Sequence, residues 1–397
     1  MVLKMIYDAK FFDEVFERRG HDATKWDNPL FVKDNKDIVP MWVADMDFEC
    51  ADCIKEALHK YVDDPLGYFA TPQEYYETVI KWEKERHGFD VKKEWICITP
   101  GIVPALYWAV KTYVKPGEAV IINTPVYYPF KNAILAGGCK CIESQLVETG
   151  RTYTIDYEKF EKDIVENNVK LYILCNPHNP SGRVWTRAEL ERVADICLRH
   201  DVFVIADEIH CELTYGDIRY TPYGTLGERC RRRAAICVSP SKAFNIAGLQ
   251  IANIVAEDDD VRRRIDRAIN DNEVCDVNPF GVVATIAAYE RGGEWLDALR
   301  AYLWDNYCFA REYIAANMPL CKVTPAEGTY LLWVDVSAYG IPSETLCDRL
   351  EAEARVKLSP GPDYGPGGEG FVRINLACPR SRLAEGLRRI AAWLAVL

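Results

Sequence analysis

The sequence lacks the features of a membrane protein and of a nucleic-acid-binding protein. Among its 397 residues, no run reaches the roughly 18 apolar residues that a membrane-spanning helix needs. The formal net charge is −12, because 60 acidic residues outnumber 48 basic ones. A chain of this charge is repelled by DNA, RNA and anionic lipid surfaces. We therefore expect neither a nucleic acid nor a membrane among its partners.

The sequence also lacks the marks of an exported or zinc-binding protein. Its first twenty residues carry acidic side chains and no apolar core, unlike a signal peptide. Fifteen cysteines without an export signal predict reduced thiols and a cytoplasmic location. Cys50 and Cys53 form a CxxC pair, but there is no second such pair to complete a zinc site. We therefore expect no metal.

What the chain does contain is an alternation of short apolar runs with helical patterns. Continuous apolar runs bounded by turn residues are typical of strands buried on both faces, as in a parallel sheet. The helical spacing is clearest in 186–200, where Thr186 and Glu189 predict a capping box. The strands are predicted at 95–99, 119–123, 170–175, 202–206, 234–238 and 249–256. This order predicts an α/β fold with a doubly wound, mostly parallel sheet.

After about residue 290 the pattern changes. Helices are predicted at 295–317, at 343–355 and from Pro379 onward, and strands at 321–323, 330–336 and 370–378. We expect a large α/β domain over 46–290 and a smaller α+β domain formed by 1–45 and 291–397. Residues 365–370 match the GxGxxG pattern, but a loop precedes them and a strand follows, so they do not predict a dinucleotide site.

Reactive groups follow the predicted strands, and ligands of open α/β sheets bind beyond the carboxyl ends of strands. These groups are the helix start at Ile102 and Val103, Tyr127, Asn179, Asp207, His210, Ser239 and Lys242. Helix-start N–H groups bind phosphate, tyrosine stacks on a flat ring, and lysine forms a Schiff base with an aldehyde. Because a carboxylate can also hold a pyridinium nitrogen protonated, the set predicts pyridoxal 5'-phosphate (PLP) as cofactor.

Three motifs resemble those of the fold-type I PLP-dependent aminotransferase superfamily. They are NPHNPSGRVW from Asn176, ADEIH from Ala206 and SPSKAFNIAGLQ from Ser239. The resemblance covers nearly the whole chain and is strongest to the cystathionine beta-lyase branch, the bacterial C–S lyases. It implies the PLP-dependent transferase fold of type I, with a large doubly wound domain and a smaller α+β domain.

The resemblance also implies roles for residues around the cofactor ring. Lys242 would form the Schiff base and later carry protons, and Asp207 would pair with the pyridine nitrogen. Asn179 would hydrogen-bond the ring hydroxyl, and Tyr127 would stack on the ring. These four residues would hold the reactive part of PLP.

Further roles implied by the resemblance concern the phosphate and the substrate. Ile102 and Val103 would bind the phosphate through backbone N–H groups, and Ser239 would bind it through its hydroxyl. Tyr68 would reach the phosphate of the neighbouring subunit, which implies a homodimer with a shared active site. Arg373 would grip the α-carboxylate of an amino-acid substrate, a task that suits the guanidinium fork.

Two positions depart from the ordinary aminotransferase pattern and fit the C–S lyase branch. His210 stands where many aminotransferases have a tyrosine, and Gln250 stands where they often have a phosphate-binding arginine. His210 would either bond the ring hydroxyl or pack beside Asp207. Without an arginine at 250, the phosphate would depend more on N–H groups and hydroxyls.

The branch implies α,β-elimination from L-cystathionine, L-cysteine or a related S-substituted cysteine, which yields a thiol, pyruvate and ammonia. Lys242 would remove the α-proton, and either Lys242 or Tyr127 would protonate the leaving sulfur. The alternatives are transamination on the same scaffold and a PLP-binding regulator, although the presence of Lys242 and Arg373 favours an enzyme. Trp42 and residues 43–48 either cover the mouth of the site or simply pack.

Overall fold

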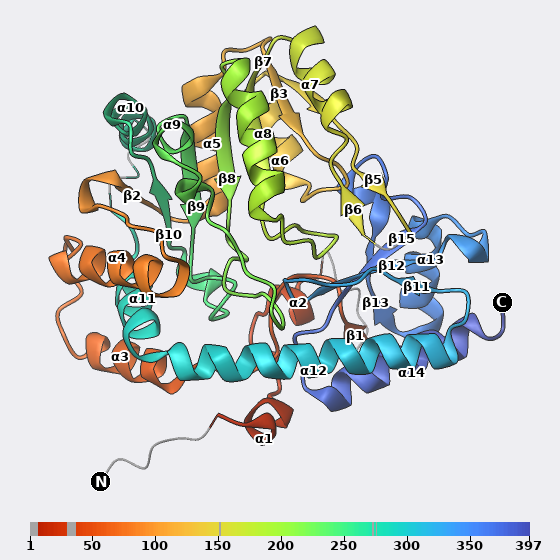
Figure 1. The fold of residues 1–397 in the computed structure, drawn as a ribbon. Coiled ribbons are helices and arrows are strands. Elements are labelled where there is room, and N and C mark those ends of the chain that lie inside the picture. Colours follow the sequence, from red (N-terminus) through yellow and green to blue (C-terminus); the bar gives the residue numbers. More distant parts are fainter. Residues whose placement is uncertain (1–6, 30–36, 151, 272–273, 275) are drawn as a thin grey trace.

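The computed structural model describes residues 7–29, 37–150, 152–271, 274 and 276–397, and its main element is a seven-stranded sheet (Figure 1). The strands, in spatial order, are β2 (Ile96–Thr99), β10 (Ala252–Val255), β9 (Ala234–Val238), β8 (Phe203–Asp207), β7 (Val169–Cys175), β3 (Ala119–Ile122) and β4 (Lys140–Glu143). Neighbours are parallel except at β10, which runs antiparallel to both β2 and β9. The predicted α/β fold with a mostly parallel sheet is confirmed.

Helices cover both faces of this sheet because successive strand residues point to opposite faces. In β7, Leu171 and Ile173 pack into one apolar cluster, whereas Tyr172 and Leu174 pack into another. The first cluster includes α5 (Ile102–Tyr113), α6 (Pro129–Ala136) and α10 (Asp259–Asn270). The second includes α7 (Tyr157–Glu166), α8 (Arg187–Arg199), α3 (Asp52–Val62), α4 (Gln73–His87) and α11 (Pro279–Arg291). Burial on both faces explains the continuous apolar runs of the sequence.

Strong local signals predict the structure correctly, and weak ones do not. The capping box at α8 is present: Glu189 N–H donates to the Thr186 hydroxyl at 3.3 Å, and Thr186 N–H donates to the Glu189 carboxylate at 2.8 Å. The strand predicted at 249–256 starts only at Ala252, because Gln250 has a left-handed backbone with φ of 55°. Strand β4 was not predicted, since it lies at the sheet edge and is not fully buried.

A second, antiparallel sheet holds the strand order β11 (Lys322–Val323), β12 (Leu331–Asp335), β15 (Phe371–Asn375) and β14 (Ser359–Pro360). The longest helix, α12 (Gly293–Asn317), runs along the base of the molecule and packs against α14 (Arg380–Leu394) (Figure 1). Helix α13 (Ser343–Arg349) packs on the same sheet. In the described ranges, no helix is long and apolar enough to cross a membrane.

The N-terminal segment joins the C-terminal part of the chain. Strand β1 (Val39–Pro40) pairs in parallel with β13 (Val356–Lys357), and α1 (Ala9–Asp13) packs against α12. The remaining short elements are α2 (Thr24–Asp27), α9 (Glu228–Arg231), β5 (Val147–Glu148) and β6 (Tyr153–Thr154). We propose that the two larger sheets belong to two domains, 46–290 and 1–45 with 291–397.

The glycine-rich loop at 365–370 has a packing role. A Cβ atom on Gly361 would lie 1.8 Å from the Gly368 carbonyl oxygen, and one on Gly368 would lie 2.0 Å from the Gly361 oxygen. The two backbones therefore approach each other as only glycine allows. This loop leads into β15 and so helps to place Arg373 on that strand.

Candidate active site

A cavity of about 760 Å³ opens where the ends of β7, β8 and β9 face the second sheet. The predicted site residues that line it are Ile102, Val103, Tyr127, Asn179, Asp207, His210, Lys242 and Arg373. The structure thus brings together residues that lie up to 271 positions apart (373 − 102 = 271). Ser239 and Tyr68 do not line this cavity.

Lys242 lies in the turn that follows β9, with its amine in the cavity wall. Its Nζ donates a hydrogen bond of 2.7 Å to the backbone carbonyl of Ala44. Burial lowers the pKa of Lys242 to about 8, although the charge of Asp45 opposes this shift. A substantial fraction of this amine is therefore neutral near pH 7 to 8, the form that attacks a carbonyl or removes a proton.

Asp207 is the last residue of β8 and lies opposite Cys175, the last residue of β7. The carboxylate is buried and accepts a hydrogen bond of 3.2 Å from the N–H of Ile209. Burial raises the pKa of Asp207 to about 7. Within the described part of the chain, no cation forms an ion pair with it. A protonated ring nitrogen in the cavity would supply the missing positive charge.

Arg373 projects from β15 and connects three parts of the site. Its Nη1 donates to Oδ1 of Asn179 at 3.0 Å, and its Nη2 donates to the carbonyl of Trp42 at 2.6 Å. The guanidinium also lies over the ring of Tyr364, 5.1 Å from the ring centre. Among the described residues, its buried Nε finds no acceptor. That donor is available to a carboxylate of a bound ligand.

His210 is buried in the cavity wall, where its ring lies edge-on to the ring of Tyr330. Burial lowers the pKa of His210 to about 3, and the charges of Lys242 and Arg373 act in the same direction. The imidazole is therefore neutral. Its Nδ1 has no partner among the described residues, so it can exchange a hydrogen bond with a ligand. Both roles expected for His210 remain open to it.

The phosphate end of the predicted site is formed by backbone. Gly101, with φ of 156°, precedes the twelve-residue helix α5, whose first residues are Ile102 and Val103. Their N–H groups lie at a helix start that no side chain caps. The Ser239 hydroxyl instead donates to the Ile251 carbonyl at 2.7 Å, and it is Ser241 that lines the cavity.

The N-terminal segment forms part of the cavity wall, and its role as a cover over the mouth of the site stays a prediction. Trp42, Val43 and Ala44 line the cavity, and the carbonyls of Trp42 and Ala44 accept hydrogen bonds from the lining residues Arg373 and Lys242. The Ala44 carbonyl accepts from Tyr330 at 3.1 Å as well as from Lys242. Lining residues that sequence reasoning missed are Tyr128, Ser241, Lys357, Asp363 and Tyr364. For Asp363 and Tyr364 the available signal was the loop rich in glycine and proline before β15, and Ser241 lies within the motif that contains Lys242.

The donors in this cavity fit PLP. Asp207 is a buried carboxylate that forms no ion pair with any described residue, Lys242 is an amine with a lowered pKa, and α5 offers uncapped N–H groups. Tyr127 and Asn179 lie on the same wall, where they can contact a ring and its hydroxyl. Tyr68 is fully exposed and lies apart from its own cavity.

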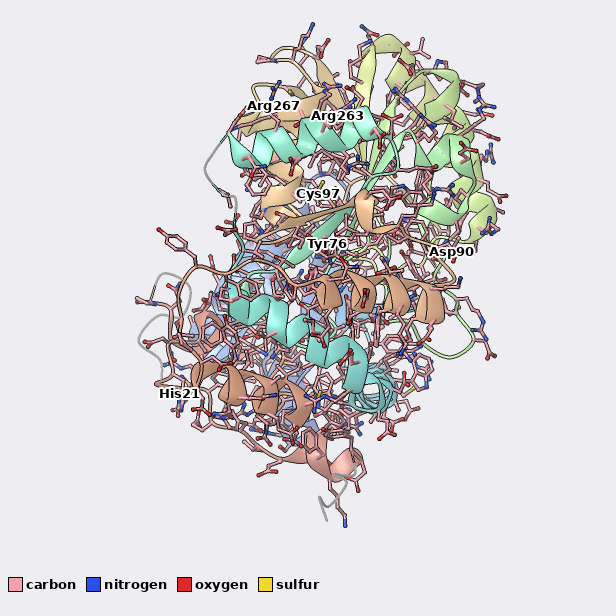
Figure 2. The ribbon with its side chains drawn as sticks, turned by 90° about the vertical axis from the view of Figure 1, so that its left-hand side faces the viewer. His21, Tyr76, Asp90, Cys97, Arg263 and Arg267 are labelled. Carbon is pink, nitrogen blue, oxygen red and sulfur yellow. The ribbon has the colours of Figure 1, made fainter. Side chains whose placement is uncertain are left out.

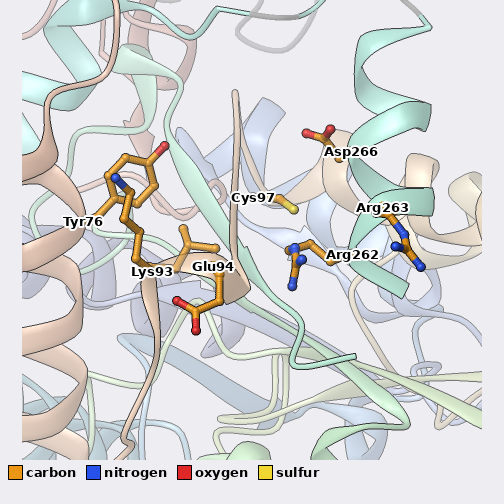
Figure 3. Close-up of a pocket in the computed structure, with 8 residues that line it drawn as sticks. Tyr76, Lys93, Glu94, Cys97, Arg262, Arg263 and Asp266 are labelled. Carbon is orange, nitrogen blue, oxygen red and sulfur yellow. The ribbon is translucent and has the colours of Figure 1, made fainter. Parts of the chain in front are cut away.

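A second pocket, of about 380 Å³, lies at the β2 edge of the large sheet. Figure 2 shows that Tyr76 of α4, Cys97 of β2 and Arg263 of α10 lie on this side of the molecule. Figure 3 shows its mixed charges, which come from Lys93, Glu94, Arg262, Arg263 and Asp266. None of the predicted site residues lines it, so the larger cavity is the candidate active site.

A buried polar cluster lies beyond the strand end that carries Asp207. Glu212 accepts hydrogen bonds from His87 Nε2 at 2.7 Å and from Trp82 Nε1 at 2.6 Å. His87, Cys211 and Glu212 place their ligand atoms within 4.8 Å of one another. However, the contacts to Glu212 are those of a hydrogen-bonded ion pair, and burial raises the pKa of Cys211. The cluster therefore anchors the segment that follows β8.

Comparison with known proteins places the chain in a family. The model for aminotransferase class I and II matches residues 36–390. Cystathionine beta-lyase PatB of Bacillus subtilis (strain 168) is 40% identical over 384 residues, which cover 96% of this chain and 99% of that protein.

Two solved structures are also similar. Cystalysin from Treponema denticola, which contains PLP, has a TM-score of 0.94 and 36% identity, covering 99% of this chain and 100% of its own. The PLP-bound C–S lyase from Staphylococcus hominis has a TM-score of 0.90 and 33% identity, covering 96% and 97%. The chain belongs to the aminotransferase class I and II family.

Proposed function

We propose that this protein is a PLP-dependent carbon–sulfur lyase that catalyses α,β-elimination from L-cystathionine or a related S-substituted cysteine. The observation that carries the proposal is the meeting of Lys242, Asp207 and Arg373 in one cavity. The relatives named cystathionine beta-lyase and C–S lyase support β-elimination over transamination. The products would be a thiol, pyruvate and ammonia.

Bound PLP would supply an electron-withdrawing ring that acidifies the α-proton of the substrate. The residues of the chain hold and move the reacting groups around it. Asp207 would keep the ring nitrogen protonated, and Asn179 would bind the ring hydroxyl. Arg373 would fix the substrate through its α-carboxylate, with Nε as a donor that no described residue uses.

Proton movement would depend on Lys242. Its pKa of about 8 allows the neutral amine to take the α-proton near neutral pH. The proton can then pass to the leaving sulfur, either from Lys242 or from Tyr127. Burial raises the pKa of Tyr127, which keeps its hydroxyl protonated and able to donate. Both groups line the cavity, so each is a candidate donor.

We also propose a homodimer with a shared active site and a cytoplasmic location. Tyr68 is fully exposed in the single chain, so a neighbouring subunit would give its aromatic ring a cavity to enter. The reduced state of the cytoplasm suits a chain with fifteen cysteines. Sedimentation of the holoenzyme and a Tyr68→Ala variant would test the dimer and the contribution of Tyr68 to PLP affinity.

The direct test is pyruvate release from L-cystathionine by the PLP-loaded protein with no keto acid added. Sustained release is the expected result. Conversion of the cofactor to its pyridoxamine form without pyruvate would instead establish an aminotransferase. An absence of both reactions, with PLP still bound at Lys242, would favour a PLP-binding regulator.

A further inference from the structure

Two charged residues of the cavity have no part in the proposed chemistry. They are Lys357 and Asp363. Lys357 donates to Glu351 at 2.7 Å, so its charge is balanced within the protein. Asp363 differs: across the described ranges, its carboxylate makes neither a hydrogen bond nor an ion pair. Besides Asp207, which the proposed ring nitrogen would pair with, Asp363 is therefore a second cavity carboxylate without an ion pair among the described residues.

Asp363 lies where the outer part of a substrate would pass. It precedes Tyr364, and the guanidinium carbon of Arg373 lies over the Tyr364 ring, 5.1 Å from the ring centre. Arg373 and Asp207 are buried, whereas Asp363 is exposed and so belongs to the mouth of the cavity. A substrate that is held by its α-carboxylate at Arg373, with its α-carbon at Lys242, would direct its sulfur substituent outward.

We propose that Asp363 binds an ammonium group on the leaving-group side of the substrate. The inference rests on the proposed function and names its substrate class: S-substituted cysteines whose thiol product carries an amino group, such as L-cystathionine. Partial burial and the nearby charge of Glu344 raise the pKa of Asp363, although the charge of Arg373 acts in the opposite direction, so a further cation at this point would stabilise the carboxylate. A carboxylate at the same place would be repelled.

The test compares L-cystathionine with S-(3-carboxypropyl)-L-cysteine, which lacks only the distal amino group. The measurement is kcat/KM for pyruvate release, with S-methyl-L-cysteine as a reference for the reaction itself. Asp363→Asn should lower kcat/KM for L-cystathionine about tenfold, as expected for a charge-assisted hydrogen bond at a partly exposed site. S-methyl-L-cysteine should change less than about twofold, since it does not reach this residue. The carboxypropyl analogue should change as little or react faster, because the variant removes a repelling charge.

Glu344→Gln is the matched control. It also removes one negative charge, from a residue that is near Asp363 but does not line the cavity. It should leave the preference among the three substrates unchanged. Asp363→Lys should reverse the order of L-cystathionine and its carboxypropyl analogue. An equal loss for all three substrates in Asp363→Asn, or an unchanged preference in both Asp363 variants, would overturn the proposal.

A binding measurement separates this inference from the proposed function. Titration of the holoenzyme with both compounds, followed by the cofactor absorbance, gives affinities that need no turnover. If no substrate yields pyruvate, the lyase proposal fails. Even then, if Asp363→Asn abolishes the tighter binding of the compound with the distal amino group, Asp363 binds that group. If the tighter binding is unchanged in Asp363→Asn, it does not.

Discussion

The amine of Lys242 donates a hydrogen bond to the carbonyl of Ala44, a residue 198 positions earlier in the chain. The bond joins the end of β9 to the N-terminal segment over the cavity. Tyr330 donates to the same carbonyl, so one peptide group receives both contacts. Lys242 is thus held by backbone from a distant part of the chain, and this position leads to the first two predictions.

Replacement of Lys242 by alanine should abolish elimination. Loss of a general base and cofactor anchor costs at least about 10³-fold in rate. The free energy of unfolding should change little, because alanine removes the desolvation cost of the amine together with its hydrogen bond. Pyruvate release and thermal unfolding measure the two effects. Lys111→Ala, on the exposed face of α5, is the control and should retain activity.

Incorporation of PLP into the apoenzyme should accelerate with pH and reach half its maximal rate near pH 8. Only the neutral amine attacks the aldehyde, and the pKa of Lys242 is lowered from 10.5 to about 8. The amine therefore becomes neutral as pH rises through about 8 rather than through 10.5. Stopped-flow absorbance after mixing with PLP gives the profile. A midpoint near that of a free lysine would contradict the assignment.

The charge of Asp45 should influence the pH midpoint of PLP incorporation. Its negative charge opposes the effect of burial on Lys242, so Asp45→Asn should move the midpoint to lower pH. Asp45 lies 3.0 Å from Arg18 in an ion pair, and the matched control is therefore Arg18→Met, which breaks this pair but keeps the carboxylate. Arg18→Met should lower the midpoint less than Asp45→Asn does, or raise it. Equal downward shifts in both variants would point to a structural effect instead.

Replacement of Arg373 by lysine should weaken substrate binding more than it slows the chemical step. Lysine keeps the charge but cannot bond Asn179, Trp42 and a carboxylate from one planar group. Loss of a charged hydrogen bond of about 1.5–3 kcal/mol corresponds to a rise in KM of roughly 10- to 100-fold. Steady-state kinetics with L-cystathionine measure it. A fall in kcat at constant KM would argue against a role in binding.

The His87–Glu212 pair should make the free energy of unfolding decrease as the pH rises from neutral to alkaline values. Although burial alone lowers the pKa of His87, the Glu212 carboxylate raises it to about 9. Because the folded-state pKa lies above the usual 6.5, the contribution is fully present below about pH 6.5 and is lost as pH rises through about 9. The free energy of unfolding in urea should therefore fall between these values.

His87→Gln should remove most of this pH dependence and lower stability at pH 6 by on the order of 2 kcal/mol, since Glu212 keeps Trp82 as a donor. His21→Gln is the control, because His21 is exposed. If the wild type and His87→Gln lose stability in parallel between pH 6 and 10, the ion pair does not carry the effect.

Much of the fold could be predicted because its signals are local. Burial on both faces produces uninterrupted apolar runs, as in β7. The capping pair Thr186 and Glu189 predicts the start of α8. The groups placed at the carboxyl ends of strands, including Asp207 and Lys242, meet in the cavity because parallel strands end at one edge of a sheet. An edge strand such as β4 carries no such signal, since solvent covers part of it.

The sequence by itself determined the type of sheet and indicated Lys242 and Asp207 as candidate site residues, since strand periodicity and motif spacing are properties of neighbouring residues. Only the tertiary structure decided that Ser241 rather than Ser239 lines the cavity, because this depends on the path of the turn after β9. It also decided that Asp363 shares the cavity with Lys242. Contacts between segments so far apart depend on how two sheets pack, and no local pattern encodes that packing.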